Sequence, residues 1–335
     1  MVSLSERFSN YKKQVQNYIY NREIKNFNKI CEKENKFKDF SKHTIISGEP
    51  RGGTTWLMEL LMNEKDCIIW EPLHYKYLGA YNKGFLNQVG HMPYIPENQE
   101  WAEAKEYFMK LFGGQLPYGM NVNFQYKNNP LKENRNLLIK FCRANMLLPW
   151  LNSQFPEIRP IYLIRHPLSV ISSQFRHSSF NEVGTLHNLF EVRKNGIPRF
   201  SDIFDKYEDK ISKIKSRESM YANWWAIQNL LPLKSQNRNW ITVSYESLFL
   251  NPLNELERIA HHLNTEVSNF NTENINNPSK TTKEGSGILE NRNQLSNFKR
   301  HLSSEQIKEI LDIIHSYGID CYSDELEPRY DKLGY

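Results

Sequence analysis

The chain has 335 residues, of which 39% are hydrophobic and 13% aromatic, so it can bury the core of one large α/β domain or two ordinary ones. Its net charge of +5 equals the excess of ten basic over five acidic residues in the first 42 residues, and the neutral remainder does not fit a dedicated nucleic-acid binder. No run of 18 apolar residues and no apolar export signal is present, so we expect a cytoplasmic protein without a membrane span.

Residues 1–42 form the first unit that the pattern predicts. Leu4, Phe8, Tyr11, Val15 and Tyr18 recur at steps of three and four, which indicates one or two amphipathic helices packing on the body. Their basic outer face is interpreted as solvated surface, with contact to an anionic membrane or acceptor surface as the alternative. The four cysteines form no C-x-x-C pair, which favours reduced thiols in a cytosolic protein.

The body of the chain alternates between short apolar runs and helical patterns. This alternation predicts an α/β fold of the P-loop-like sandwich type, with a central parallel β-sheet covered by helices on both faces. The predicted strands are residues 43–47, 67–70, 137–141, 160–164 and 240–244. The predicted helices are residues 54–63, 146–154, 168–176, 203–231 and 252–262.

Two stretches interrupt the alternation inside the predicted main domain, residues 43–320. Residues 74–130 are interpreted as an acceptor-side insertion with one helix near 101–111, and residues 265–297 as a long loop. Residues 321–335 are taken as a C-terminal tail. The aromatic residues of the insertion fit either sugar-stacking walls or the core of a covering subdomain: Tyr75, Tyr77, Tyr81, Tyr94, Trp101 and Tyr126.

A glycine-rich loop follows the first predicted strand. Gly48, four residues and then Gly53-Thr54-Thr55 give the spacing of a phosphate-binding P-loop, whose backbone N–H groups and helix N-terminus favour an anion. Gly52 and Gly53 permit close approach, and Arg51 adds a permanent cation.

The loop carries Thr54 where a nucleotide-hydrolysing P-loop has lysine, and no predicted strand ends in an apolar run plus Asp. Both features disfavour a P-loop nucleotide kinase, which would bind Mg²⁺ and ATP. A kinase and a non-catalytic nucleotide-binding module remain the alternatives from other functional classes.

The segment "PRGGTTW" resembles the 5′-phosphosulfate loop of sulfotransferases that use 3′-phosphoadenosine 5′-phosphosulfate (PAPS). The resemblance implies that Arg51, Gly52, Gly53, Thr54 and Thr55 bind the 5′-phosphosulfate. It also implies that Trp56 stacks on adenine, against the alternative of a helix core residue.

A second segment, "YLIRHPLSVISSQF", resembles the 3′-phosphate motif of the same family, in which an arginine closes a strand and a serine follows eight residues later. The resemblance assigns Arg165 and Ser173 to the 3′-phosphate. Tyr245 in "VSYESLFLNPL" matches a tyrosine that contacts the nucleotide. In "NRNQLSNFKRHLSSEQ", Arg292 is the candidate for a second 3′-phosphate contact, with Lys280, Lys283 and Lys299 as alternatives.

The position of the catalytic base separates branches of this family. In "IKFCRANMLLP", Lys140 aligns with the catalytic lysine of the cytosolic branch, whereas Cys142 stands where that branch has its catalytic histidine. "CIIWEPLHYKY" resembles the Glu-Pro-Leu/Val segment of the carbohydrate sulfotransferases, which makes Glu71 the candidate base. The alternative for Glu71 is a structural ion pair or helix cap, and His74 is the second candidate base or an acceptor contact.

The sequence therefore predicts a sulfotransferase that moves a sulfuryl group from PAPS to a hydroxyl, most simply of a carbohydrate or glycolipid, and releases adenosine 3′,5′-bisphosphate. The alternative acceptor is a hydroxyl or amine of a small molecule such as a secondary metabolite. No metal and no nucleic-acid partner are expected, and the sequence does not indicate the oligomeric state.

Overall fold

The computed structural model describes residues 37–63, 66–73, 88–89, 93–115, 136–177, 200–279 and 294–335, with ten positions between 11 and 33. Two of these early positions, Tyr11 and Val15, are helical as expected, but their side chains are 66% and 39% exposed. The expectation that this face packs on the body is therefore wrong for these two residues.

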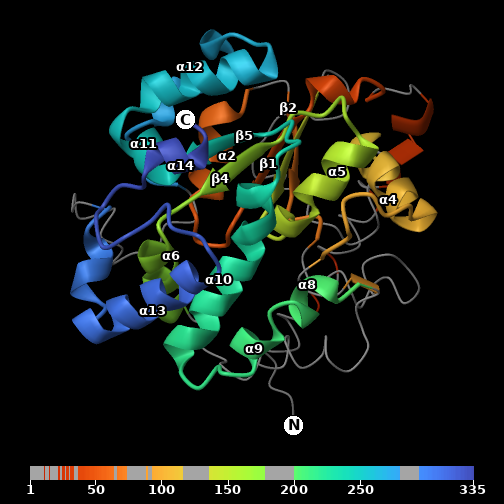
Figure 1. The fold of residues 1–335 in the computed structure, drawn as a ribbon. Helices are drawn as coiled ribbons and strands as arrows, with labels where there is room; N and C mark the ends of the chain where they lie inside the picture. Colours follow the sequence, from red (N-terminus) through yellow and green to blue (C-terminus); the bar gives the residue numbers. More distant parts are fainter. Residues whose placement is uncertain are drawn as a thin grey trace.

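The centre of the molecule is an all-parallel sheet of five strands in the order β2-β3-β1-β4-β5 (Figure 1). The predicted P-loop-like sandwich is confirmed. The strands are β1 (Thr44–Gly48), β2 (Asp66–Trp70), β3 (Asn136–Phe141), β4 (Ile161–Ile164) and β5 (Ile241–Ser244). Short runs rich in Ile, Leu and Val form such strands because both faces of a covered parallel sheet are buried.

Alternating side chains of these strands enter different cores. Ile45 packs on one face of the sheet and Ile46 on the other, and Ile139 and Leu138 repeat this alternation on β3. One face is covered by α2 (Thr54–Leu61), α11 (Tyr245–Leu250) and α12 (Pro252–Leu263). The other is covered by α4 (Ala102–Phe112), α5 (Leu148–Gln154), α6 (Pro167–Phe175), α10 (Arg217–Lys234) and α13 (Ser304–Ser316).

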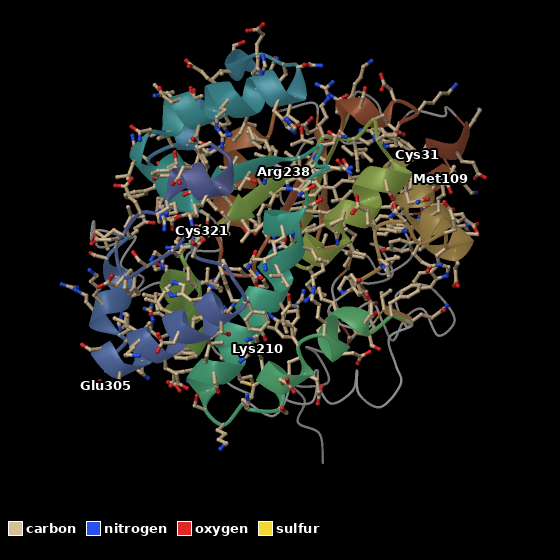
Figure 2. All side chains as sticks on the ribbon, in the orientation of Figure 1. Cys31, Met109, Lys210, Arg238, Glu305 and Cys321 are labelled. Atoms are coloured by element: carbon tan, nitrogen blue, oxygen red, sulfur yellow. The ribbon has the colours of Figure 1, made fainter. Side chains whose placement is uncertain are left out.

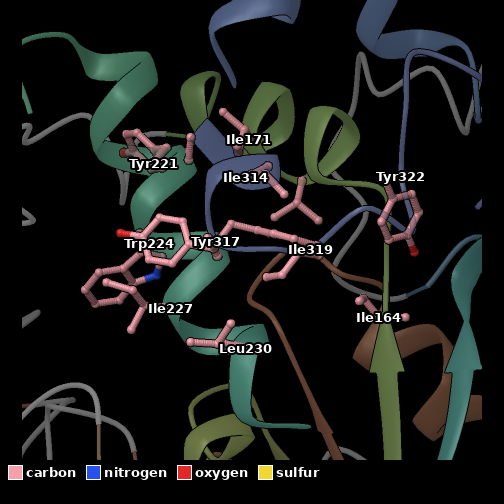
Figure 3. Close-up of a cluster of buried hydrophobic side chains, with 14 of the residues drawn as sticks. Ile164, Ile171, Tyr221, Trp224, Ile227, Leu230, Ile314, Tyr317, Ile319 and Tyr322 are labelled. Atoms are coloured by element: carbon pink, nitrogen blue, oxygen red, sulfur yellow. The ribbon is translucent and has the colours of Figure 1, made fainter. Parts of the chain in front are cut away.

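Helix α10 is the central support of the second face and runs through the middle of the molecule in Figure 1. A capping box between Ser216 and Ser219 starts it, so the single helix expected over 203–231 is wrong. The structure has α8 (Asp202–Asp205) and α9 (Glu208–Ile211) before α10. Figure 3 shows Trp224, Ile227 and Leu230 of α10 beside Ile314 and Tyr317 from the α13 end.

The remaining short elements connect these layers. They are η1 (Phe40–Lys42), η3 (Asn145–Leu147), η5 (Val267–Asn269), η6 (Thr272–Asn274), η7 (Asn297–Arg300) and α14 (Tyr330–Leu333). Side chains fill the space between the elements (Figure 2). Cys321, which belongs to the C-terminal segment after α13, is buried. Within the described ranges, no helix has the length and apolarity needed to cross a membrane.

The register of the strands decides where a site can form. Trp70 pairs with Lys140 and Gly48 with Leu163, while Ile164 pairs with Ser244, so all five strands end at one edge. Strands β3 and β4 lie on the two sides of β1, which makes the end of β1 a topological switch point. Ligands of open α/β sheets bind at such points.

Candidate active site

The glycine-rich loop begins with a tight turn at the end of β1. The Gly52 N–H donates to the Glu49 carbonyl oxygen at 2.8 Å, and Arg51 has φ = 74°. Pro50 before a residue with positive φ is the pattern of a type II turn, which favours glycine at the position that Arg51 occupies. Arg51 therefore has a strained backbone, at a cost of about 1 kcal/mol.

The loop ends at the N-terminus of α2. Gly53 has φ = 97°, and a Cβ atom built there would lie 2.5 Å from the Tyr245 ring, so only glycine fits. The first bond of the helix runs from the Leu57 N–H to the Gly53 carbonyl. The N–H groups of Thr54 and Thr55 consequently have no intrahelical acceptor, and the positive end of the helix is open to an anion.

Arg165 and Ser173, which the sequence predicts beside this loop, do lie there. The Arg51 Nε–H donates to Ser173 Oγ at 3.1 Å, and an Arg165 Nη1–H donates to the Arg51 carbonyl oxygen at 3.2 Å. The Arg165 guanidinium also lies 3.9 Å from the centre of the Tyr245 ring. The end of β4 and helix α6 thus meet the loop after β1.

Arg176 is a third cation in this cluster, which the sequence analysis missed. It stands three residues after Ser173, one helical turn further along α6, and this spacing was the available signal. Burial, together with the charges of Arg165 and Arg176, lowers the pKa of Arg51. None of the three guanidinium groups forms an ion pair with a described carboxylate.

Arg165 Nε is buried and has no hydrogen-bond partner among the described residues. A cluster of cations with a buried, unsatisfied donor is costly unless an anion completes it. The cluster therefore has the donors and the charge to bind a phosphate group.

The two aromatic candidates for adenine, Trp56 and Tyr245, have ring centres 5.5 Å apart. Tyr245 is 4% exposed, with its hydroxyl donating to Gln294, whereas Trp56 is half-buried. Tyr245 therefore supports the loop through Gly53 and Arg165 and presents little surface, and Trp56 offers the larger accessible ring.

The candidate base Glu71 lies at the end of β2, directly beside the end of β3. A Lys140 Nζ–H donates to Glu71 Oε1, and the Cys142 N–H donates to Oε2 at 3.0 Å. The Glu71 N–H donates to the Lys140 carbonyl oxygen at 2.9 Å, and Glu71 has φ = 53°. The pairing of Trp70 with Lys140 brings these residues together.

Charges decide the ionisation of this buried group. Burial by itself raises the pKa of Glu71, but the charges of Lys140 and Arg143 and the hydrogen bonds outweigh it, so the pKa lies below its ordinary value. Burial opposes the charged form of Lys140 as well, yet its contacts with Cys142 and Glu71 raise its pKa. Glu71 is therefore a carboxylate and Lys140 an ammonium at neutral pH.

Cys142, which replaces the histidine of the cytosolic branch, connects this pair to the loop. Its Sγ lies 3.3 Å from Thr54 Oγ1 and 3.6 Å from Lys140 Nζ. Burial, reinforced by the Glu71 charge, raises the pKa of the thiol to about 12. Cys142 is thus neutral and cannot substitute for a histidine base.

Some predicted residues fall outside the part of the chain that the structure describes: His74, Arg292, Lys280, Lys283, Tyr75, Tyr77, Tyr81 and Tyr126. Lys299 is described and lies on η7, which packs on α6 through Phe298 and His166. Tyr94 and Trp101 are core residues, 7% and 5% exposed, so of the two interpretations left open for the insertion, core packing holds for them.

A family model described as "Sulfotransferase domain" matches residues 41–316. The chain belongs to this family. It is therefore a sulfotransferase enzyme, with PAPS as the sulfuryl donor that is the norm of the family, and the kinase alternative is wrong. A comparison with curated proteins gave no match.

Solved structures give weak similarities across most of the chain. The sulfotransferase domain of a Synechococcus olefin synthase is 17% identical over 83% of this chain and 94% of its own, with a TM-score of 0.41. The sulfotransferase domain of the curacin biosynthetic pathway is 17% identical over 82% and 98%, with a TM-score of 0.41. A mouse sulfotransferase complexed with PAP is 10% identical over 82% and 84%, with a TM-score of 0.39.

The strained turn gives a prediction that involves backbone conformation alone. We expect Arg51→Gly to be about 0.5–1 kcal/mol more stable to unfolding than Arg51→Ala, because glycine adopts the positive φ of this position without strain. Both variants lack the guanidinium, so the comparison isolates the backbone. Urea titration measures the difference; an Arg51→Ala variant as stable as Arg51→Gly would contradict it.

Proposed function

We propose that this sulfotransferase transfers a sulfuryl group from PAPS to a hydroxyl of a carbohydrate or glycolipid by in-line displacement, with Glu71 as the general base. The observation that carries the proposal is the Glu71 carboxylate at the end of β2, hydrogen-bonded to Lys140 and linked through Cys142 to Thr54 of the loop. A base must lie within reach of the acceptor proton, and this carboxylate adjoins the loop proposed to hold the donor.

The donor site is assigned from the cations and donors around the loop. The residues proposed for the 5′-phosphosulfate are Arg51, Gly52, Gly53, Thr54 and Thr55. Those proposed for the 3′-phosphate are Arg165, Ser173 and Arg176. The uncompensated charge and the buried, unpartnered Arg165 Nε support this fit. Trp56 is proposed as the adenine platform, with Tyr245 holding Arg165 beneath it. PAPS supplies the sulfuryl group, and adenosine 3′,5′-bisphosphate is the product that remains.

Glu71 has the ionisation state that a base needs. Its lowered pKa keeps it unprotonated at neutral pH, so it can accept the proton that the attacking hydroxyl releases. The Cys142 N–H holds Oε2 in place, and Lys140 holds Oε1. Lys140 also brings positive charge close to the loop, where it stabilises negative charge that develops on the departing phosphate oxygen.

The acceptor class follows from the type of base. A glutamate followed by Pro72 and Leu73 resembles the segment of carbohydrate sulfotransferases, and the neutral Cys142 separates this chain from the histidine-dependent branch. The residues that would contact the acceptor are expected in the insertion. A small-molecule hydroxyl or amine is the second candidate and is tested in the same screen.

The first prediction concerns the 3′-phosphate. Arg165→Ala should weaken binding of adenosine 3′,5′-bisphosphate by about 10- to 100-fold, as expected for a lost charged hydrogen bond, and should change binding of adenosine 5′-phosphate much less. Calorimetric titration measures both affinities. Arg258→Ala is the matched control, because Arg258 also lies on a tyrosine ring, that of Tyr335, at 4.1 Å. Equal losses for the two nucleotides would remove Arg165 from the 3′-phosphate site.

A second prediction tests the base. Glu71→Gln keeps an acceptor for Lys140 but cannot take up a proton, so turnover should fall by about 10²–10⁴ while bisphosphate affinity stays nearly unchanged. Single-turnover kinetics with PAPS and calorimetry measure the two quantities. Near-normal turnover would show that another group, such as His74, is the base.

The acceptor class needs a direct test. With radiolabelled PAPS, the enzyme should sulfate members of a panel of glycans and glycolipids, and Glu71→Gln should abolish the signal. A panel of phenols, alcohols and amines forms the second arm. Transfer to small molecules with none to glycans would refute the carbohydrate proposal and leave the sulfotransferase assignment intact.

A further inference from the structure

Glu49 is an acidic side chain inside the loop proposed to bind an anion. It stands between Gly48 and Pro50, it is 1% exposed, and none of the ion pairs among the described residues includes it. A buried carboxyl group costs free energy unless its surroundings satisfy it. Because Glu49 lies in the loop proposed to bind the phosphosulfate, its side chain can affect donor binding.

Asn229 of α10 holds the Glu49 carboxyl. Asn229 Oδ1 accepts from the Tyr162 hydroxyl at 2.6 Å and from Asn145 Nδ2 at 3.1 Å. Asn229 Nδ2 donates to Glu49 Oε1 at 3.2 Å and to the Trp225 carbonyl at 2.8 Å. All four hydrogen-bonding positions of the amide are used, which fixes its orientation and makes Glu49 Oε1 an acceptor.

The same network reaches β1, β4 and the segment that follows β3. Asn145 follows β3 and accepts at Oδ1 from Ser47 Oγ of β1 at 2.7 Å, while Tyr162 belongs to β4. Gln228 of α10 lies next to Glu49 Oε2, at 3.5 Å. Glu49 is therefore the point at which the loop joins a buried network shared by three strands and α10.

The loop is otherwise held from the α6 side. Gln174 Nε2 donates to the Pro50 carbonyl at 3.0 Å, and Arg165 donates to the Arg51 carbonyl. Both contacts are made to the two central residues of the turn, Pro50 and Arg51. The first residue, Glu49, is instead bound by Asn229 of α10. Without the Glu49 side chain, the turn that orients Arg51 would lose its contact with α10 and keep its contacts with Gln174 and Arg165.

We propose that Glu49 is a positioning residue for donor binding: Asn229 and Gln228 of α10 hold its side chain and thereby fix the turn that presents Arg51 and the loop N–H groups to the 5′-phosphosulfate. The inference rests on the proposed role of the loop in donor binding. It requires neither Glu71 as the base nor a carbohydrate acceptor, so it can fail or succeed independently of those assignments.

The charge state of Glu49 supports the proposal. Burial raises its pKa well above the ordinary value, although the Asn229 hydrogen bond and the Arg143 charge oppose this shift. The titratable groups that face it are Arg143, after β3, and Tyr162, on β4. A neutral carboxyl puts no negative charge behind the anion site, whereas its ionisation would oppose the charge of the donor.

The sign of the pH effect follows from the raised pKa. The folded protein holds a proton on Glu49 that the unfolded chain releases near the ordinary pKa, so this stabilisation is complete below that value and is lost as pH rises through the folded-state pKa. A glutamine carries no titrating proton. Glu49→Gln should thus lose less stability than the wild type as pH rises.

The experiment compares the wild type with Glu49→Gln, Glu49→Ala and a control, Asn223→Ala. Asn223 is also a buried amide of α10, but its hydrogen bonds among the described residues go to the Ser219 carbonyl and the Tyr317 hydroxyl and not to the loop. Calorimetry with adenosine 5′-phosphosulfate and with adenosine 3′,5′-bisphosphate at pH 7 and pH 9 gives affinities, and thermal melts give stability.

We expect Glu49→Ala to bind both nucleotides about tenfold more weakly than Asn223→Ala, because a buried hydrogen-bonded anchor of the loop is lost. Glu49→Gln should bind within about twofold of the wild type at pH 7, since a glutamine can keep the acceptor toward Asn229.

Equal affinities of Glu49→Ala and Asn223→Ala would overturn the proposal, because the effect would then be general destabilisation of α10. A Glu49→Gln variant as weak as Glu49→Ala would overturn it as well. If the bisphosphate binds every variant like the wild type and the Arg51 and Arg165 variants do so too, the donor assignment itself is wrong.

Discussion

The packing of the Tyr245 ring is the constraint on which the anion site depends. The ring follows β5, occupies the space where a Cβ of Gly53 would lie, and carries the Arg165 guanidinium at 3.9 Å from its centre. It therefore joins the ends of β5, β1 and β4 in one contact. A glycine is required at position 53 for two separate reasons, the positive φ and the ring, and the loop can approach β5 only because both are met.

The two halves of the site use charge in opposite ways. Around the loop, Arg51, Arg165 and Arg176 form no ion pair with a described carboxylate, which leaves their charge for a ligand. At the ends of β2 and β3, Glu71 and Lys140 neutralise each other in a buried pair. The first arrangement suits the anionic donor proposed to bind there, and the second keeps a carboxylate ionised in an apolar place where an isolated one would take up a proton.

Backbone strain is concentrated at these same positions. Among the described residues, three that are not glycine have positive φ, and two of them, Arg51 and Glu71, are the cation of the loop and the proposed base. Such conformations persist where the surrounding structure determines them. Here the Glu49–Gly52 turn holds Arg51, and hydrogen bonds to Lys140 and Cys142 hold Glu71. The backbone conformations that place Arg51 and Glu71 thus cost local stability.

The sheet and the loop could be predicted from the sequence, together with many of the residues proposed for the site. Apolar runs of four or five residues that alternate with helical patterns indicate strands buried on both faces, and the spacing of Gly48 and Gly53 indicates a strand–loop–helix turn. Parallel strands end at one edge, so Arg165 and Glu71 could be expected beside the loop before their contacts were known.

The pairings across that edge could not be predicted from the sequence, because they depend on long-range packing. The strand order placed Lys140 against Glu71, and the turn of α6 added Arg176 to the cation cluster. Glu49 gave no local signal, because its proposed role depends on Asn229, which is 180 residues away in the sequence. The sequence also did not reveal that residues 203–231 form three helices. The apolar pattern is continuous there, but a serine capping box starts α10 at a separate point. Local periodicity specifies elements, whereas long-range packing and buried polar contacts specify which side chains meet.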